Sequence, residues 1–219
     1  MDKLKDGLLQ CGIEEEMIES VSAKMEAYIK EIILFNSAYN LTNTSDHDEL
    51  VIRHILDSLS AYKPLKELAA KLKDNQGFCF ADIGSGGGLP GIPLAACFLD
   101  FEFKLVERMS KRCAFLENCA AILGLKNVKV LNLEAEKVPE NSIDIAVFRA
   151  FRPLDQAMTK TLLRLTKKGG YLAAYKAKME NIKTEMEGVK NLTGEYSVVE
   201  LKVPFMNESE RNLVLVNKN

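Results

Sequence analysis

The sequence contains no tryptophan, only two histidines, and no apolar segment long enough to cross a membrane. A membrane-spanning helix needs about 20 consecutive apolar residues, and charged or amide side chains interrupt the apolar runs well before that length. The first ten residues, MDKLKDGLLQ, lack the apolar stretch and cleavage site of a signal peptide. Without a secretion signal, we expect the five cysteines to be reduced and the protein to be cytoplasmic.

Metal-binding residues are also scarce. The cysteines form no C-x-x-C pair, and His47 and His54 are the only imidazoles, so we expect no metal site. The remaining composition, 47% hydrophobic and 27% charged residues, is ordinary for a soluble globular protein. A chain of 219 residues is long enough to bury one full hydrophobic core and a small appendage.

Charge is distributed unevenly, although the net charge is only −2. Residues 1–103 have 9 Lys or Arg against 17 Asp or Glu, a net charge of −8. Residues 104–190 have 17 against 10, a net charge of +7. A basic central segment favours a positively charged face that binds phosphates, but a solvated helical surface would give the same pattern.

The first part of the chain is predicted to be helical. Over residues 14–36, apolar side chains recur at three- and four-residue steps, and Gly12 is placed to end a shorter helix before them. A further helix is predicted for DELVIRHILDSLSAY, residues 48–62. Its polar face carries Arg53, His54, Asp57 and Ser58. We therefore expect a helical N-terminal extension over residues 1–63.

From residue 77 the pattern changes to short apolar runs separated by amphipathic helices. The predicted strands are FCFADI, FEFKLVE, NVKVLNL, IDIAVFRA and GGYLAAYK. Strands that alternate with helices of 10–15 residues are typical of a parallel sheet covered on both faces. The last two runs, YSVVELKVP and NLVLVNK, are predicted to form an antiparallel edge. We expect residues 64–219 to form a Rossmann-like α/β domain that makes one compact unit with the extension.

A glycine-rich segment, DIGSGGGLPGIP, follows the first predicted strand and precedes a predicted helix. Its first glycines, Gly84, Gly86 and Gly88, allow the backbone to turn sharply and to approach a ligand where a Cβ would collide. A helix N-terminus behind such a loop attracts a negatively charged group. This strand–loop–helix context is the one in which a glycine motif indicates a nucleotide-type ligand.

Two classes of cofactor fit this loop. The pattern G-x-G-x-x-G from Gly86 is that of a dinucleotide-binding fold, and Glu107 lies about 20 residues downstream, where a ribose-binding acid is expected. The pattern D-x-G-x-G-x-G, which begins at Asp82, is that of methyltransferases that use S-adenosylmethionine. Asp82 favours the second class, because a carboxylate would repel a pyrophosphate but attract the ammonium group of S-adenosylmethionine.

Other polar residues follow later predicted strands, at the edge where open α/β sheets bind ligands. Ala135 and Glu136 come after VKVLNL, where a carboxylate or backbone groups would reach adenine. Arg149 ends the strand IDIAVF. This arginine is predicted either to orient the methyl donor or the acceptor, or to form a surface ion pair.

Together these segments resemble the RsmG family, also called glucose-inhibited division protein B, whose members methylate N7 of a guanine in bacterial 16S ribosomal RNA. The matching segments, in chain order, are NLT (40–42), RHxxDSL (53–59), DIGSGGGLPGIPLA (82–95), LVE (105–107), KRxxFL (111–116), AE (135–136) and RA (149–150). Two positions depart from the family pattern, which usually has Arg at position 134 and Gly at position 177.

The resemblance implies a class I methyltransferase fold with a seven-stranded, mostly parallel sheet and S-adenosylmethionine as the cofactor. It implies 16S rRNA or the small ribosomal subunit as the partner and a monomeric chain. The cofactor contacts that it implies are Gly84, Leu89, Glu107 (on the ribose), Ala135, Glu136 and Arg149, beside Asp82, Gly86 and Gly88 of the loop.

The predicted chemistry is simple, because guanine N7 carries a free lone pair and needs no proton removed. The sequence accordingly has neither an Asn-Pro-Pro-Tyr motif nor a Pro-Cys nucleophile, and we predict no general base. RNA binding is predicted for Arg53, His54, Arg108, Lys111, Arg112, Arg152 and Lys176. The alternatives are an NAD(P)-dependent oxidoreductase with the same loop and a non-catalytic rRNA-binding assembly factor.

Overall fold

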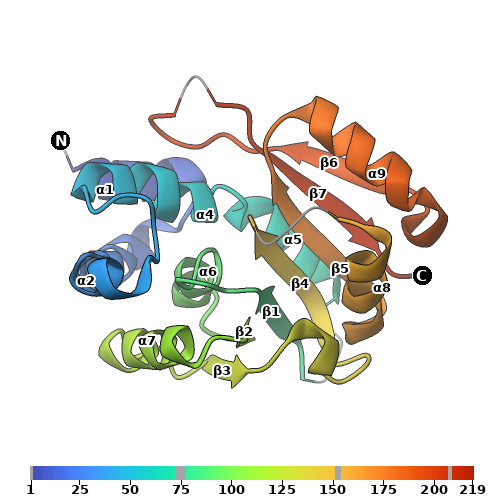
Figure 1. The fold of residues 1–219 in the computed structure, drawn as a ribbon. Helices are drawn as coiled ribbons and strands as arrows, with labels where there is room; N and C mark the ends of the chain where they lie inside the picture. Colours follow the sequence, from blue (N-terminus) through green and yellow to red (C-terminus); the bar gives the residue numbers. More distant parts are fainter. Residues whose placement is uncertain (1, 73–76, 151–153, 207–208) are drawn as a thin grey trace.

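A seven-stranded sheet forms the centre of the molecule (Figure 1), in a computed structural model that describes residues 2–72, 77–150, 154–206 and 209–219. The strand order is β3-β2-β1-β4-β5-β7-β6. The strands are β1 (Cys79–Ile83), β2 (Glu102–Glu107), β3 (Val128–Asn132), β4 (Ile143–Arg149), β5 (Thr166–Lys176), β6 (Tyr196–Glu200) and β7 (Asn212–Asn217). Only the pairs that include β7 are antiparallel, which confirms the predicted mostly parallel sheet.

Helices cover both faces of the sheet (Figure 1). The N-terminal helical segments are α1 (Lys3–Cys11), α2 (Glu15–Tyr39), α3 (His47–Leu50), the π-helical segment η1 (Val51–Leu56), α4 (Asp57–Leu59) and α5 (Tyr62–Leu72). The others are α6 (Gly91–Cys97), α7 (Ser110–Ile122), the 3-10 segment η2 (Ala135–Lys137), α8 (Gln156–Leu165) and α9 (Met179–Thr193). No helix in the described ranges is long and apolar enough to cross a bilayer.

The hydrophobic core has two layers, because successive residues of a strand point to opposite faces of the sheet. In β1, Phe80 packs with the N-terminal helices, α6 and α7, whereas Cys79 and Ala81 pack with α8 and α9. All five residues of β1 are buried. This burial on both sides explains why the strands read as continuous apolar runs rather than as alternating ones.

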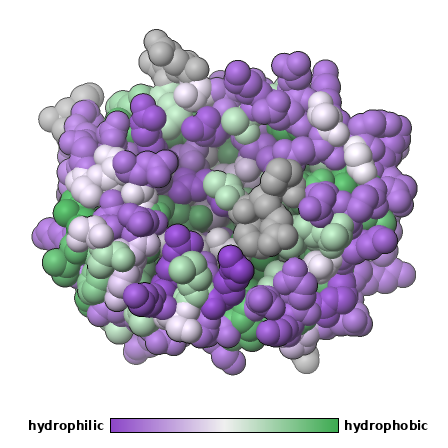
Figure 2. Space-filling view, in the orientation of Figure 1, coloured by the Kyte–Doolittle hydropathy of each residue, from purple (hydrophilic) through white to green (hydrophobic). Residues whose placement is uncertain are grey.

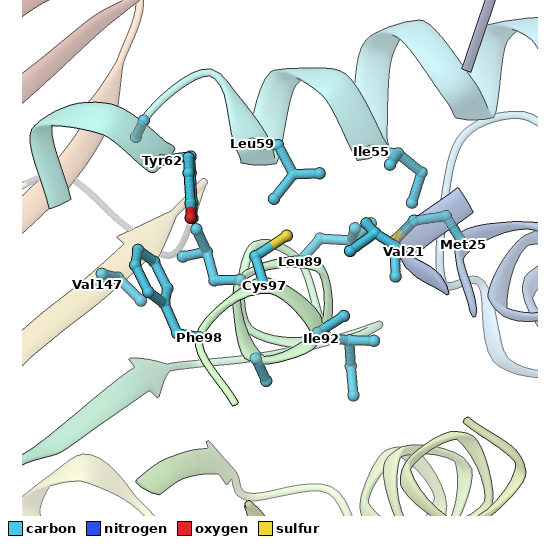
Figure 3. Packing of buried hydrophobic residues seen from close by; sticks show 14 of the residues in the cluster. Val21, Met25, Ile55, Leu59, Tyr62, Leu89, Ile92, Cys97, Phe98 and Val147 are labelled. Atoms are coloured by element: carbon cyan, nitrogen blue, oxygen red, sulfur yellow. The ribbon is translucent and has the colours of Figure 1, made fainter. Parts of the chain in front are cut away.

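The N-terminal helices share their core with the sheet domain. In Figure 3, Leu59 and Tyr62 lie above α6, which presents Cys97, and Phe98 follows directly after it. The rings of Tyr62 and Phe98 are 4.9 Å apart between centroids. The predicted division between residues 63 and 64 falls inside α5, and the separation of the chain into an extension and a domain stays a prediction.

Most predicted elements are present. Gly12, for example, ends α1 in the left-handed region, with φ 86°, as the sequence indicated. There are three differences. The helix over 48–62 includes the π-helical segment, and β5 begins at Thr166 because that residue pairs with Ile143 across an irregularity in register. Helix α9 was not predicted, although Ile182, Met186 and Val189 give it a buried face at helical spacing.

Candidate active site

Two cavities open at the carboxyl ends of the parallel strands, where ligands bind in folds of this kind. The first has a volume of about 390 Å³ and lies at the ends of β1, β2, β3 and β4. Its lining consists of Gly84, Val106, Glu107, Arg108, Met109, Arg112, Leu133, Glu134, Ala135, Glu136 and Ala150. Four residues predicted to contact the cofactor, namely Gly84, Glu107, Ala135 and Glu136, therefore lie together at one cavity.

The glycine loop is shaped by its own packing as much as by access to a ligand. Gly84, Gly86 and Gly88 have φ angles of 70°, 58° and 92°. A Cβ on Gly88 would lie 2.6 Å from Ile92 Cγ1 and 2.8 Å from the Tyr28 hydroxyl, so this position is closed by the protein itself. Gly88 was predicted to be bare for ligand approach, and in the structure its absent side chain makes room for these neighbours instead.

Asp82 is buried beneath the loop and holds it to the following helix. Its Oδ2 accepts hydrogen bonds from Ser85 Oγ at 2.8 Å and from the Gly91 N–H at 2.9 Å. Its Oδ1 is buried and has no hydrogen-bond partner among the described residues. Burial raises the pKa of the Asp82 carboxyl to about 6, because the charged form is poorly solvated there. An oxygen in this state has unused capacity to accept from a ligand.

Glu107 ends β2 as a carboxylate fixed on both oxygens. Its Oε2 accepts from the Gly86 N–H at 3.0 Å, and its Oε1 accepts from the Met109 N–H at 2.8 Å. The residue is 5% exposed and lines the first cavity. A carboxylate held in this way, with lone pairs left over, suits the paired hydroxyl groups of a ribose.

The rest of the first cavity combines apolar and basic side chains. Met109, Leu133 and Ala135 supply apolar surface. Arg108 and Arg112, which were predicted to bind RNA, lie in this lining, beside residues that were predicted to contact the cofactor. Glu134, a departure from the family pattern, also lines the cavity, and its carboxylate is 3.3 Å from Lys137 Nζ.

The second cavity, of about 530 Å³, adjoins the first and shares Ala150 with it. Its lining consists of Arg53, His54, Asp57, Phe148, Arg149, Ala150, Tyr175, Lys176, Ala177 and Arg211. It therefore lies between the helical segment of residues 47–59 and the ends of β4 and β5. Ala150 has φ 51°, a left-handed conformation that a larger side chain would make more costly.

Arg149 lies in the second cavity and not in the first. Its Nη1 donates to Asp57 Oδ2 at 2.6 Å, and Arg211 Nε donates to the other oxygen, Oδ1, at 3.0 Å. One buried carboxylate thus holds two guanidinium groups.

His54 lies beside them, and burial together with the Arg149 charge lowers the pKa of its imidazole to about 4, so the ring is neutral at pH 7.

The other predicted residues are placed as follows. Asp82, Gly86, Gly88 and Leu89 are not in the lining of either cavity. Of the predicted RNA-binding residues, Arg53, His54 and Lys176 line the second cavity, and Lys111 is exposed at the start of α7. Arg152 lies outside the described residues. Among those described, no group of three or more His, Cys, Asp or Glu side chains is arranged to hold a metal ion.

Three residues that build these sites were not predicted from the sequence: Tyr28, Asp57 and Arg211. The Tyr28 hydroxyl donates to the Gly87 carbonyl and so ties α2 to the glycine loop. Asp57 was visible on the polar face of its helix, but nothing in the local pattern distinguished it from a solvated acid. Arg211 precedes a C-terminal strand, and no nearby motif marks it.

The strand order, the glycine loop and the cavity at the carboxyl edge of the sheet define a class I methyltransferase fold. Similar solved structures include the tRNA (m1A58) methyltransferase TrmI from Aquifex aeolicus, with 19% identity, a TM-score of 0.55 and coverage of 72% of this chain and 68% of that one. A SAM-dependent O-methyltransferase from Thermotoga maritima has 15% identity and a TM-score of 0.53, covering 72% and 66%. At these identities the likeness shows the fold alone.

The chain belongs to the rRNA small subunit methyltransferase G family, whose family model matches residues 21–214. The Ribosomal RNA small subunit methyltransferase G of Treponema denticola is 40% identical over 238 residues, which cover 98% of this chain and 93% of that protein. The protein of the same name from Francisella philomiragia is 32% identical over the full length of both chains. The family resemblance is confirmed, and neither the oxidoreductase nor the non-catalytic alternative gains support.

Proposed function

We propose that this protein transfers a methyl group from S-adenosylmethionine to N7 of a guanine in 16S rRNA of the small ribosomal subunit. The observation that carries the proposal is the first cavity, which brings Glu107 and the glycine loop together at the carboxyl edge of a class I methyltransferase sheet. Membership of the methyltransferase G family supports rRNA as the class of acceptor.

The residues of the first cavity fit S-adenosylmethionine. Glu107 would hold the ribose hydroxyl groups, and Leu133, Ala135 and Met109 would enclose the adenine. Asp82 lies outside the cavity lining, but its buried Oδ1, which has no partner among the described residues, would accept from the ammonium group, directly or through a water molecule. The described residues leave this oxygen unsatisfied, which is costly unless a ligand or water compensates.

The bound cofactor supplies an activated methyl group on its sulfonium sulfur. The protein has to hold the acceptor nitrogen in line with that methyl group and to exclude water, and orientation of this kind accounts for a large share of rate enhancement in two-substrate reactions. Guanine N7 needs no base, and His54 would be a poor one because its pKa of about 4 leaves it little basicity. Ala150, which lines both cavities, marks where the two substrates would meet.

RNA would approach over the basic residues around the two cavities. Arg53, Arg108, Lys111, Arg112 and Lys176 all lie there among the described residues. The face shown in Figure 2 is mostly hydrophilic, with hydrophobic residues in separate small areas, which suits a polar, charged partner better than an apolar one. We further propose that the protein acts as a monomer in the cytoplasm.

Mapping of N7-methylguanine in small-subunit rRNA tests this function. We expect one modified guanine in cells that contain the protein, loss of the modification on deletion of the gene, and its return on complementation. Complementation with a Glu107→Ala variant, which removes the ribose-binding carboxylate, should fail. An unchanged methylation map after deletion would contradict the proposal.

A further inference from the structure

Four residues predicted to contact S-adenosylmethionine, namely Gly84, Glu107, Ala135 and Glu136, line the first cavity, whereas Arg149 is the one predicted contact that lines the second. It adjoins the first cavity through a single shared residue, Ala150. Its volume of about 530 Å³ is within the usual range for small-ligand sites. Two chemically different compartments thus lie side by side at the edge of the sheet, and the second has no ligand assigned to it.

The floor of the second cavity is organised by Asp57. The Asp57 side chain is 7% exposed and bridges Arg149 and Arg211, whose side chains are 15% and 30% exposed. The three residues come from α4, the end of β4 and the residue before β7, so the bridge joins three distant parts of the chain. A carboxylate with both oxygens engaged fixes the orientation of both guanidinium planes.

Each arginine keeps a donor that this bridge does not use. Among the described residues, Nη2 of Arg149 has one contact, a long one of 3.5 Å with His54 Nδ1. Arg211 uses Nε for Asp57 and Nη1 for the Glu210 carbonyl, and its Nη2 has no hydrogen-bond partner in the described part of the chain. The cavity therefore contains N–H donors of Arg149 and Arg211, held in a fixed orientation, to which a ligand could supply the acceptor.

The charges around the cavity define what kind of ligand these donors suit. Lys176 is paired with Glu185 at 2.5 Å, so it is largely compensated. The guanidinium groups of Arg149 and Arg211 on the one carboxylate of Asp57 leave one excess positive charge. The Tyr175 hydroxyl already donates to the Ser58 carbonyl at 2.7 Å, so its proton is not available to a ligand. A ligand for this site should therefore present hydrogen-bond acceptors to these donors.

We propose that the second cavity binds the acceptor guanine, and that Asp57 is the positioning residue that directs Arg149 and Arg211 onto the guanine O6. This inference rests on the proposed function. Guanine presents the acceptors O6 and N7 side by side, whereas adenine has a donor amino group in place of O6. N–H donors on O6 would hold guanine and leave N7 free to attack the methyl group. Adenine would be rejected, because its amino group would face the N–H groups of the two arginines without an acceptor between them.

The first test compares Asp57→Asn with Asp144→Asn. Asp144 is a matched control because it is also a buried acid, paired with Lys167 at 2.8 Å, but lies at the opposite end of β4. Five residue steps along the strand separate it from Arg149, about 17 Å. Rates of single-turnover methylation would be measured on unmethylated small subunits, with calorimetry of S-adenosylhomocysteine and melting curves for each variant.

For Asp57→Asn we expect methylation about tenfold slower or worse, with S-adenosylhomocysteine affinity within about twofold of the unmodified protein. Asp144→Asn should lose comparable melting temperature and keep its rate when assayed below both transitions. Equal rates in the two variants, or a rate loss in Asp57→Asn that is matched by lost cofactor affinity, would overturn the positioning role. Absence of methylation by the unmodified protein would instead count against the proposed function.

A second measurement does not depend on a variant that folds. The Nε–H resonances of Arg149 and Arg211 would be followed by NMR in the complex with S-adenosylhomocysteine, while guanosine or adenosine 5′-monophosphate is added to millimolar concentration. We expect both resonances to move with the guanine nucleotide and to move several-fold less with the adenine nucleotide. No shift with either nucleotide, or equal shifts with both, would overturn the assignment of this cavity to guanine.

Discussion

Gly88 and Gly124 both have positive φ angles, yet only Gly88 is enclosed by other side chains. A Cβ would lie 2.6 Å from Ile92 at Gly88, whereas none of the neighbouring atoms comes within 4 Å at Gly124. Both alanine variants would carry the strain of a left-handed residue, about 1 kcal/mol. Only Gly88→Ala adds overpacking, typically about 1–3 kcal/mol.

We therefore expect Gly88→Ala to melt at a clearly lower temperature than Gly124→Ala and to bind S-adenosylhomocysteine more weakly. Thermal melting and calorimetry on the two proteins measure this difference. If the variants were equally stable and bound equally well, the loop would have to relax around the new methyl group, contrary to its tight packing.

The buried Asp82 is expected to make the free energy of unfolding depend on pH in a defined direction. The pKa of this carboxyl is about 6 in the folded protein, above its ordinary value of 3.8. A raised pKa means that the folded state is favoured by protonation, so this contribution is complete below pH 4 and is lost as pH rises through 6. The span corresponds to about 3 kcal/mol as an upper estimate.

Replacement of Asp82 by Asn removes this titration. The free energy of unfolding of Asp82→Asn, minus that of the unmodified protein, should increase between pH 4 and pH 7. Binding of S-adenosylhomocysteine should be weaker in the variant at pH 7, because the amide offers no charge to the ammonium group. Denaturant unfolding at several pH values tests the first part, and parallel pH profiles for the two proteins would contradict it.

At the scale of elements, α2 contacts the glycine loop through one hydroxyl group. Tyr28 is fully buried, and its hydroxyl donates to the carbonyl of Gly87 in the glycine loop. Tyr28→Phe would leave that carbonyl unsatisfied, at a cost of about 1–3 kcal/mol, and would loosen the loop. We expect several-fold weaker S-adenosylhomocysteine binding.

Tyr62→Phe is the control for this change. Its hydroxyl also makes one side-chain hydrogen bond, to Glu14 Oε2 at 2.7 Å, but it lies away from the loop. This variant should keep full cofactor affinity while losing some stability. Equal affinities for the two phenylalanine variants would show that α2 does not control the loop.

The sequence predicted those parts of the site that depend on chain order. Strand ends of a parallel sheet meet at one edge, so the order of the strands alone places Glu107, at the end of β2, close to Ala135, which follows β3. Asp57 and Arg149 are separated by 92 residues and meet only because the N-terminal helices pack over that edge. No local pattern encodes such a contact, and the sequence accordingly left Arg149 between a ligand role and an ion pair.

At the scale of the whole molecule, the position of charge is more informative than its amount. Lys111 and Lys190 both belong to the basic segment of residues 104–190, but Lys111 lies in the first turn of α7, beside the first cavity, and Lys190 lies on α9. The layer that includes α9 is on the other face of the sheet. RNA that approaches the two cavities would meet Lys111 and not Lys190.

Charge reversal tests this placement. Lys111→Glu should weaken binding of small-subunit RNA and reduce the slope of log affinity against log salt by about one or more, because fewer counterions are released. Lys190→Glu, with the same change in net charge, should leave affinity and slope nearly unaltered. Filter binding at several salt concentrations gives both quantities, and identical behaviour of the variants would leave net charge as the only determinant.

The shared core of the N-terminal helices and the sheet domain also restricts how the gene can recombine. Tyr28 on α2 closes the space at Gly88 together with Ile92 and Leu116, so these residues have to be compatible in size. A hybrid that joins the first 63 residues of one relative to the rest of another would bring mismatched partners into this space. Viable exchange within the family should therefore move α2, α6 and α7 as one inherited block.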